Sequence, residues 1–312
     1  MLQLILAIAF LTGCCCPQHY DIQCPPPPLP DCPVVQKPVR LALVLGGGGA
    51  KGLAHVGVLE ELEAANIPID LVIGCSAGSI VGALYCDNPS TAYLKEILLS
   101  MKTNVLVDFD LWHCKYGLCQ GRSLRKFLRR NLCATTFDEL QKPFFLVTTD
   151  LYSSELVTLG GGPLVPSVEA SCAIPFVFVP VYLHGRAFVD GGVIDPVPVR
   201  VADHFDPEVI VAVDLRGLLP NTFPTNLFSV ASRSADITLL WQSEGSLRDA
   251  DVIIRPNLEG VGTFAEDQNE QIYQAGKNAA RDAIPQIIQC LRENLSDGLD
   301  RNRSTATFYR RE

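Results

Sequence analysis

The hydrophobic residues beyond residue 38 fall into two alternating patterns. Short apolar runs, such as residues 39–45, are typical of strands buried on both faces of a parallel sheet. Longer segments with apolar residues three and four apart, such as residues 53–66, predict helices with one buried face. The alternation predicts an α/β fold, in which helices cover both faces of a mostly parallel sheet. We expect strands at residues 39–45, 70–74, 143–149, 187–189, 209–214 and 251–255, and helices at residues 53–66, 77–85, 123–132, 227–242 and 269–291.

The amino-terminal segment has a different pattern. An almost unbroken apolar run at residues 2–11 has the length of the apolar region of a signal peptide and is shorter than the ~20 residues of a membrane-spanning helix. It ends in Leu-Thr-Gly-Cys at residues 11–14, which resembles a bacterial lipobox. We therefore expect a signal peptide at residues 1–13 and lipidation of Cys14. The usual positive charge before the apolar run is missing, since Lys37 is the first basic residue.

Residues 14–38 are rich in proline and cysteine, and such proline-rich segments favour an extended, semi-rigid geometry. We expect them to form a tether outside the folded domain, which would occupy residues 39–293 and precede a polar tail at residues 294–312. Acyl chains on Cys14 would hold the protein on a membrane surface in the bacterial cell envelope. Cys15 follows directly where an aspartate would signal retention, which favours the outer membrane.

Composition narrows the class of protein. Of 312 residues, 48% are hydrophobic and 19% are charged, as in a globular domain. The formal net charge of -9 repels phosphate backbones and argues against a nucleic-acid partner. The cysteines beyond the tether lack the paired spacing of a zinc site, and Cys114 and Cys119 have only His113 beside them. We expect no metal site, and interpret these cysteines as buried thiols or a single disulfide.

A glycine-rich loop, Gly-Gly-Gly-Gly-Ala-Lys-Gly at residues 46–52, follows the first predicted strand and precedes a helix. Its backbone N–H groups can converge on an anion or on a developing oxyanion. The loop also contains Gly-x-Gly-x-x-Gly, so a nucleotide-binding protein is an alternative. That fingerprint expects an acidic residue at the end of the second strand, whereas Asp70 stands at its beginning. A Walker A loop needs Ser or Thr after Lys51, where Gly52 stands.

The second predicted strand leads into Gly-x-Ser-x-Gly, with Ser76 between Gly74 and Gly78. In a strand-turn-helix context this motif exposes the serine hydroxyl on a sharp turn, which predicts Ser76 as a nucleophile. Two bases are possible. His204 would complete a Ser-Asp-His order, but it precedes a strand and so lies at the wrong end of the sheet. Asp190 follows an apolar strand, but an ordinary carboxylate, with a pKa of about 3.9, is a weak base unless it is desolvated.

The three motifs Gly-Gly-Gly-x-Lys-Gly, Gly-x-Ser-x-Gly and Asp-Gly-Gly, in this order, resemble the patatin-like phospholipase family. Residues 52–59 and 170–175 add to the resemblance, which extends over residues 39–291. It implies a three-layer α/β/α sandwich and a serine hydrolase of the phospholipase A or lysophospholipase type, without cofactor or metal. The implied substrate is a phospholipid or another acyl-ester lipid.

The resemblance also implies a role for individual residues. Ser76 and Asp190 would form a catalytic dyad, and backbone amides of the glycine loop would form the oxyanion hole. The implied oxyanion residues are Gly47, Gly48, Gly49 and Ala50, and the remaining motif glycines are Gly52, Gly74, Gly78, Gly191 and Gly192. A catalytically silent lipoprotein scaffold stays open as a third possibility.

Two further features lie outside these motifs. His55 follows the glycine loop by one helical turn, and we interpret it as a packed histidine that braces the loop. Residues 106–118 are unusually aromatic, which is compatible with a lid or lipid-facing wall and equally with a buried satellite cluster.

Overall fold

The computed structural model describes residue 22 and residues 25–32, 34–100, 108–110, 115–216, 223–261 and 268–308. The predicted signal peptide and Cys14 lie outside these ranges. The strands are β1 (Leu41–Leu45), β2 (Leu71–Cys75), β3 (Phe144–Asp150), β4 (Leu156–Leu159), β5 (Val181–Leu183), β6 (Arg186–Asp190), β7 (Val209–Val213) and β8 (Val252–Ile254). The helices are α2 (Leu53–Ala64), α3 (Ala77–Asp87), α4 (Thr91–Leu99), α5 (Arg122–Asn131), α6 (Leu164–Ser171), α7 (Val199–Asp203), α8 (Leu227–Ser246) and α9 (Asn269–Phe308). Short 3-10 helices are η1 (Gly49–Gly52), η3 (Phe137–Glu139), η4 (Gly191–Val193) and η5 (Leu247–Asp249).

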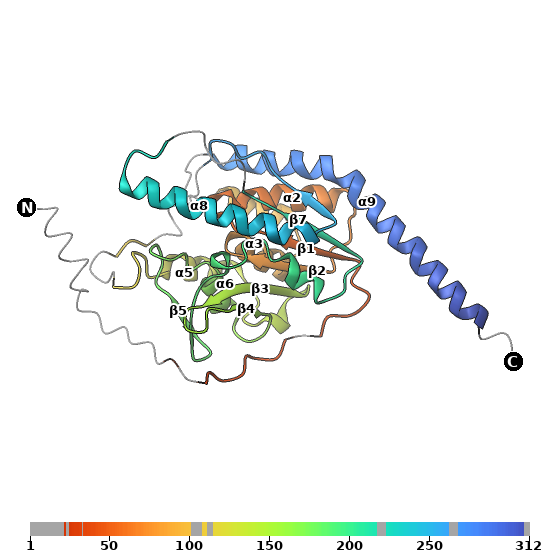
Figure 1. Ribbon diagram of the computed structural model, residues 1–312, viewed down its shortest axis with the longest axis horizontal. Coiled ribbons are helices and arrows are strands. Elements are labelled where there is room, and N and C mark those ends of the chain that lie inside the picture. Colours follow the sequence, from red (N-terminus) through yellow and green to blue (C-terminus); the bar gives the residue numbers. More distant parts are fainter. Residues whose placement is uncertain are drawn as a thin grey trace, which may run out of the picture.

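One mixed sheet forms the centre of the molecule (Figure 1). Its strand order is β5-β6-β3-β2-β1-β7-β8, and β4 pairs with β3. The pairs that involve β1, β2, β7 and β8 are parallel, as is the pairing of β2 with β3. Strands β4 and β6 run antiparallel to β3, and β5 runs antiparallel to β6. The predicted parallel centre is therefore present, and an antiparallel part extends one edge.

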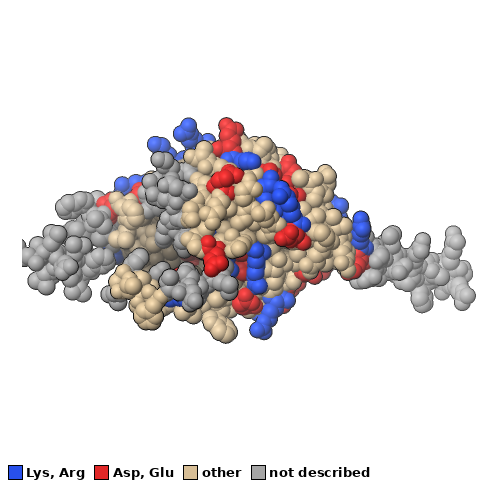
Figure 2. All heavy atoms as spheres, turned by 90° about the horizontal axis from the view of Figure 1, so that it is seen from above, with Lys and Arg blue, Asp and Glu red and all other residues tan. Residues whose placement is uncertain are grey.

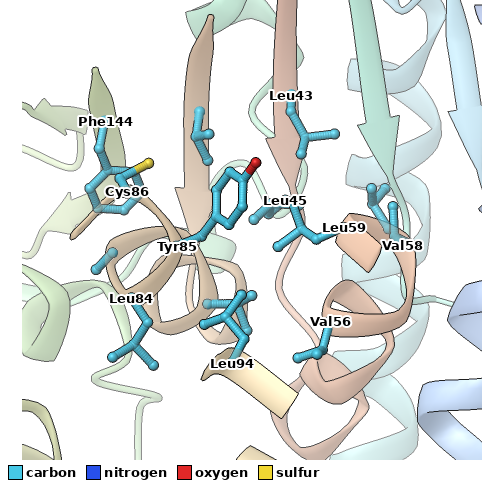
Figure 3. Packing of buried hydrophobic residues seen from close by; sticks show 14 of the residues in the cluster. Leu43, Leu45, Val56, Val58, Leu59, Leu84, Tyr85, Cys86, Leu94 and Phe144 are labelled. Carbon is cyan, nitrogen blue, oxygen red and sulfur yellow. The ribbon is translucent and has the colours of Figure 1, made fainter. Parts of the chain in front are cut away.

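Alternate residues of β1 point into opposite layers. Leu43 and Leu45 belong to the larger cluster of buried side chains, to which α2, α3, α4 and α9 contribute. Figure 3 shows part of this cluster, where side chains from β1, α2, α3, α4 and β3 meet. Ala42 and Val44 belong to a second cluster, which α7 completes on the other face of the sheet. The predicted α/β/α layering is confirmed.

Several elements differ from the prediction. Strands β4 and β5 and helices α4, α6 and α7 were not expected, because they are short and lack a long hydrophobic period. Helix α9 does not end at residue 291 but continues to Phe308, so the first part of the predicted polar tail is helical. The chain from residue 292 to 308 contains no proline, and its Arg, Glu and Leu residues have high helix propensities. Figure 1 shows this end of α9 extending away from the sheet.

The described end of the predicted tether lies against the domain. Leu29 packs against the larger hydrophobic cluster and Val35 against the smaller one. The Cys32 thiol hydrogen-bonds the backbone of Gly160. This part of residues 14–38 therefore belongs to the packed structure rather than to a free spacer, because its few apolar side chains find partners on the domain surface.

The aromatic segment at residues 106–118 is described only in part. Phe109 and Tyr116 are 70% and 38% exposed, so these two rings are not members of a buried cluster. Leu111 and Trp112 lie outside the described residues.

Charged side chains of both signs are interspersed over the face in Figure 2, which views the molecule from above. Some of them connect helices: Lys277 and Arg281 of α9 lie 3.2 Å and 2.8 Å from the Glu61 carboxylate of α2. Such pairs at the surface each contribute ~0–1 kcal/mol, so the hydrophobic contact between α2 and α9 carries most of their association. Among the described helices, none combines the length and the apolar character needed to cross a bilayer.

Candidate active site

Ser76 occupies the sharp turn that the Gly-x-Ser-x-Gly motif predicts. It lies between β2 and α3 with φ 52° and ψ -119°, a conformation that costs a residue with a side chain ~1–3 kcal/mol. The flanking glycines allow the turn. A Cβ on Gly74 would lie 2.7 Å from Ser79 Cα, and a Cβ on Gly78 would overlap the Leu45 carbonyl oxygen. The strand, turn and helix thus hold the Ser76 hydroxyl at the carboxyl end of the parallel strands.

The register of three strands brings Asp190 to the same level. Cys75, which precedes Ser76, pairs with Val147 of β3. The next residue of β3, Thr148, pairs with Asp190 on the same side of the strand, because β4 pairs with Val147 and Thr148 on the opposite side. Strands β2 and β6 therefore run toward each other along one edge of β3. Strand β6 ends at Asp190, next to the position where Ser76 follows β2.

The Asp190 carboxyl group is buried, and the side chain of Ser76 is close enough to lower its pKa. Oδ1 accepts a 2.8 Å hydrogen bond from the Gly192 amide. Burial raises the pKa of Asp190 to about 6, although the Ser76 side chain, the hydrogen bond from Gly192 and the positive charge of Arg216 act in the opposite direction. Desolvation thus supplies the basicity that an ordinary aspartate lacks.

The glycines after Asp190 are required by close approach to β3. A Cβ on Gly191 would lie 2.5 Å from the Val147 carbonyl oxygen, and a Cβ on Gly192 would lie 3.0 Å from Asp190 Oδ1. The Asp-Gly-Gly segment is therefore a turn, as its composition suggests, and it is also the element that fixes the carboxylate.

A hydrogen-bond network that the sequence did not predict supports the Ser76 turn. Ser171 Oγ donates to the Val147 carbonyl at 2.7 Å, so it accepts from the Ser79 hydroxyl at 2.7 Å and from the Ser76 amide at 3.0 Å. The Cys172 thiol donates to the Ser76 carbonyl at 3.2 Å. Residues 170–175 contributed to the family resemblance, but only the structure shows that they hold the backbone of Ser76.

The glycine loop lies beside Ser76. A Cβ on Gly47 would be 3.3 Å from Ser76 Cβ. The Gly47 amide, however, donates a 2.9 Å hydrogen bond to the Pro196 carbonyl, so it is not the oxyanion donor that the resemblance implied. The Gly48 and Gly49 amides make no such bond to a described backbone carbonyl. Ala50 lies within η1. The candidate donors of the oxyanion hole are therefore the backbone amides of Gly48, Gly49 and Ala50.

His55 braces this loop, as predicted. Its Nε2 lies 2.8 Å from the Gly46 carbonyl oxygen, which can only accept, so Nε2 carries the proton. Burial lowers the pKa of His55 to about 4, and the ring is neutral at physiological pH. His55 holds the loop, and its Nδ1 has no hydrogen-bond partner among the described residues.

The two alternative roles found in the sequence do not fit the geometry. His204 follows α7 and precedes the amino end of β7, whereas Ser76 follows the carboxyl end of β2. The two residues therefore lie at opposite ends of the parallel strands, and His204 cannot complete a triad with Ser76. Asp70 accepts hydrogen bonds from the amides of Arg40 and Leu41 at the start of β1, at the end of the sheet opposite the glycine loop. It is too remote to bind the ribose of a dinucleotide on that loop.

Two basic residues near the loop complete the site. Burial lowers the pKa of Lys51. The positive charge of Arg216 lowers this pKa further, whereas the negative charge of Asp236 acts in the opposite direction. Burial also lowers the pKa of Arg216, whose neighbours include the Cys75, Asp214, Asp190 and Asp195 side chains. Lys51 was recognised as part of the loop motif, whereas nothing in the sequence pattern indicated Arg216.

The described cysteines are free thiols, and Cys114 lies outside the described residues. Cys75 Sγ lies 3.9 Å from Asp190 Oδ1, and burial raises the pKa of its thiol. No group of three metal-ligating side chains occurs within the part of the chain that the structure describes.

The curated relatives that match part of this chain include the following three proteins. Patatin-like phospholipase domain-containing protein 6 of Mus musculus is 34% identical over 181 residues, which cover 56% of this chain and 13% of that protein. An uncharacterized NTE family protein of Mycobacterium tuberculosis is 30% identical over 178 residues, with 57% and 49% covered. Lysophospholipase nte1 of Aspergillus fumigatus is 27% identical over 266 residues, with 76% and 18% covered. The matched region thus spans less than half the length of each relative.

Solved structures with a similar arrangement include VipD from Legionella pneumophila, with a TM-score of 0.46, 17% identity, and coverage of 82% of this chain and 67% of VipD. A chain of the SpcU–ExoU complex of Pseudomonas aeruginosa has a TM-score of 0.44, 16% identity, and coverage of 83% and 53%.

The family model of patatin-like phospholipases matches residues 43–203, about half of the chain. This range contains the glycine loop, the Ser76 turn and the Asp190 turn. The resemblance noted in the sequence is confirmed, and this chain belongs to the patatin-like phospholipase family.

Proposed function

We propose that the protein is a serine lipid acyl hydrolase of the phospholipase A or lysophospholipase type. The observation that carries the proposal is the contact between Ser76, held on a strained turn, and Asp190, whose pKa burial raises to about 6. A base with a pKa near the working pH is suited to remove a proton from a hydroxyl and to return it. Lysophospholipase nte1 and patatin-like phospholipase domain-containing protein 6 support the same class of substrate.

In this mechanism, Asp190 takes the Ser76 proton as Oγ forms a bond to the ester carbonyl carbon. The carbonyl oxygen becomes an oxyanion, and the Gly48 and Gly49 amides stabilise it. The tetrahedral intermediate collapses, the bond to the alcohol oxygen breaks, and protonated Asp190 gives its proton to the leaving alcohol. Asp190 then deprotonates a water molecule, which attacks the acyl-enzyme. Fatty acid leaves, and the proton returns to Ser76.

The proposal is tested by fatty acid release from lysophosphatidylcholine by the wild-type protein and by the Ser76→Ala and Asp190→Asn variants. We expect both substitutions to reduce the rate by at least ~10³-fold while the fold is retained, since each removes a member of one unit. Ser167→Ala is the matched control, because Ser167 is also a buried serine but its hydroxyl donates a hydrogen bond to the carbonyl of Pro163, the residue before α6. Equal rates for wild type and Ser76→Ala would refute the proposal.

We also propose that Cys14 carries the lipid that holds this hydrolase on a membrane of the bacterial cell envelope. The support is the Leu-Thr-Gly-Cys pattern after an apolar run. Expression of the full chain in a bacterium with a lipoprotein pathway, followed by mass spectrometry of the amino-terminal peptide, tests this. An acylated Cys14 is expected, and cleavage elsewhere or an unmodified cysteine would refute it.

A further inference from the structure

Arg216 lies next to the glycine loop because of the strand order. It follows β7, which pairs with β1, and the Gly46 amide donates to the Val213 carbonyl at the end of β7. The Arg216 amide donates a 3.0 Å hydrogen bond to Asp214 Oδ1, which fixes the backbone at this point. The side chain therefore starts from a rigid position at the same end of the sheet as Ser76.

Helix α8 holds one side of the Arg216 guanidinium. Nη1 donates to the Leu239 carbonyl at 2.8 Å and to Ser243 Oγ at 2.7 Å. The other terminal nitrogen, Nη2, has no hydrogen-bond partner among the described residues. A guanidinium held by one nitrogen keeps the donors of the other in a fixed direction, which favours recognition of an anion.

Nη2 lies beside the glycine loop, close to Ser76. A Cβ on Gly47 would be 3.7 Å from Arg216 Nη2 and 3.3 Å from Ser76 Cβ, so the nucleophile and this nitrogen border one position in space. A glycerol backbone separates the phosphate of a phospholipid from its ester carbonyl by about 5–7 Å. A carbonyl carbon in contact with Ser76 thus leaves the phosphate within reach of Nη2.

The charges around the site favour an incoming anion. Lys51 is the second cation, and Arg216 lowers its pKa, as expected for two positive charges close together. Asp214 is nearest to Arg216 in sequence, but it is shared with Arg255, which lies 3.2 Å from it. The other carboxylates near Arg216 are those of Asp190 and Asp195, and neither forms an ion pair with the Arg216 guanidinium among the described residues. A phosphate bound here would relieve the repulsion between the two cations.

We propose that Arg216 is the residue by which this enzyme recognises the phosphate of its lipid substrate, with Nη2 donating to a non-bridging phosphate oxygen. This inference rests on the proposed function and makes it more specific. The enzyme then prefers phosphate-bearing acyl esters over neutral acylglycerols, and the preference resides in Arg216. A guanidinium that only anchors α8, or that only stabilises the oxyanion, would act equally on both kinds of ester.

The test compares two substrates with the same acyl chain, lysophosphatidylcholine and monoacylglycerol, in the same detergent micelles. The kcat/KM ratio of the two is measured for the full chain with Arg216, Arg216→Lys and Arg216→Gln. A charge-assisted hydrogen bond predicts that Arg216→Gln lowers the ratio roughly 10- to 100-fold, with Arg216→Lys in between. Because a ratio of two rates cancels the concentration of active enzyme, partial misfolding cannot imitate this result.

Arg255→Gln is the matched control, since Arg255 also contacts Asp214 and also reaches α8, through Glu244 at 2.7 Å. Its ratio is expected to stay within threefold of wild type. Equal losses on both substrates in Arg216→Gln would overturn the inference and leave the hydrolase intact, as would a wild-type enzyme that prefers monoacylglycerol. A wild-type protein that hydrolyses neither ester would refute the proposed function itself.

Discussion

Ser76 and Asp190 meet because β2 and β6 run toward each other along the same edge of β3, whose other edge carries β4. Cys75 pairs with Val147, and Asp190 pairs with Thr148, so the register of β3 sets the separation of the two side chains. The contact depends on where β2 and β6 end. Any change that shifts the Asp-Gly-Gly turn along β3 should therefore affect the proposed catalysis more than stability.

Replacement of Gly191 by alanine tests this dependence. The new Cβ would lie 2.5 Å from the Val147 carbonyl oxygen, so the turn must move and carry Asp190 with it. We expect hydrolysis to fall at least ~10²-fold, because small displacements of a reacting group cost that much. Gly245→Ala is the control, since nothing lies within 4 Å of its new Cβ and alanine favours the interior of α8. Full activity in Gly191→Ala would contradict the role of the turn.

The network around Ser171 predicts a loss of both stability and activity when its hydroxyl is removed. In Ser171→Ala, the Ser76 amide and the Ser79 hydroxyl lose their acceptor in a buried region. We expect the free energy of unfolding to fall by ~1–3 kcal/mol and kcat to fall about tenfold or more. Urea unfolding and ester hydrolysis measure the two effects. An unchanged kcat beside reduced stability would show that the network is merely structural.

The pH dependence of hydrolysis follows from the same carboxylate. Asp190 acts as a base only when ionised, so kcat/KM should decline below pH 6 with the slope of a single proton. His55, with a pKa of about 4, should not contribute between pH 5 and 8. Burial also raises the pKa of Asp195 to about 6, and Asp195→Asn is therefore the control for assignment. The pH profile of kcat/KM for Asp195→Asn should keep the inflection near pH 6. Loss of the inflection in this variant would assign the titrating group to Asp195 instead of Asp190.

Burial of Asp190 should also appear in the stability of the protein. Because the folded-state pKa of about 6 exceeds the ordinary value of 3.8, Asp190 destabilises the folded state increasingly as pH rises from 4 to 6. Asp190→Asn removes this cost, so its stability relative to wild type should improve by up to about 3 kcal/mol between pH 4 and pH 8. Urea unfolding of both proteins at pH 4 and pH 8 measures the difference in their free energies of unfolding. Titration of Asp195 affects both proteins equally and does not contribute to this difference. A pH-independent difference would contradict the raised pKa.

The sequence predicted most of the elements that position Ser76, because their signals are local. A buried strand followed by Gly-x-Ser-x-Gly and a helix needs no distant information, and β2 and α3 lie where this pattern places them. The apolar runs at residues 209–214 and 251–255 likewise predicted strands, and β7 and β8 lie at these positions.

The contacts between distant segments were beyond the sequence. The Gly47 amide donates a hydrogen bond to the Pro196 carbonyl. The pattern of hydrophobic residues contains no sign of this contact between distant segments. The Ser171 network depends on α6, whose eight residues include Pro166 and show no helical stripe. Arg216 follows a buried strand like many surface arginines, and only the strand order shows that it borders the glycine loop.

Labelling with a fluorophosphonate tests the central claim most directly, because this reagent forms a covalent bond only to an activated serine. Peptide mapping should locate the phosphonyl group on Ser76, with labelling abolished in Ser76→Ala and slowed at least ~10²-fold in Asp190→Asn. An unlabelled wild-type protein that is folded, or a label on another serine, would contradict the account and favour a catalytically silent member of the family.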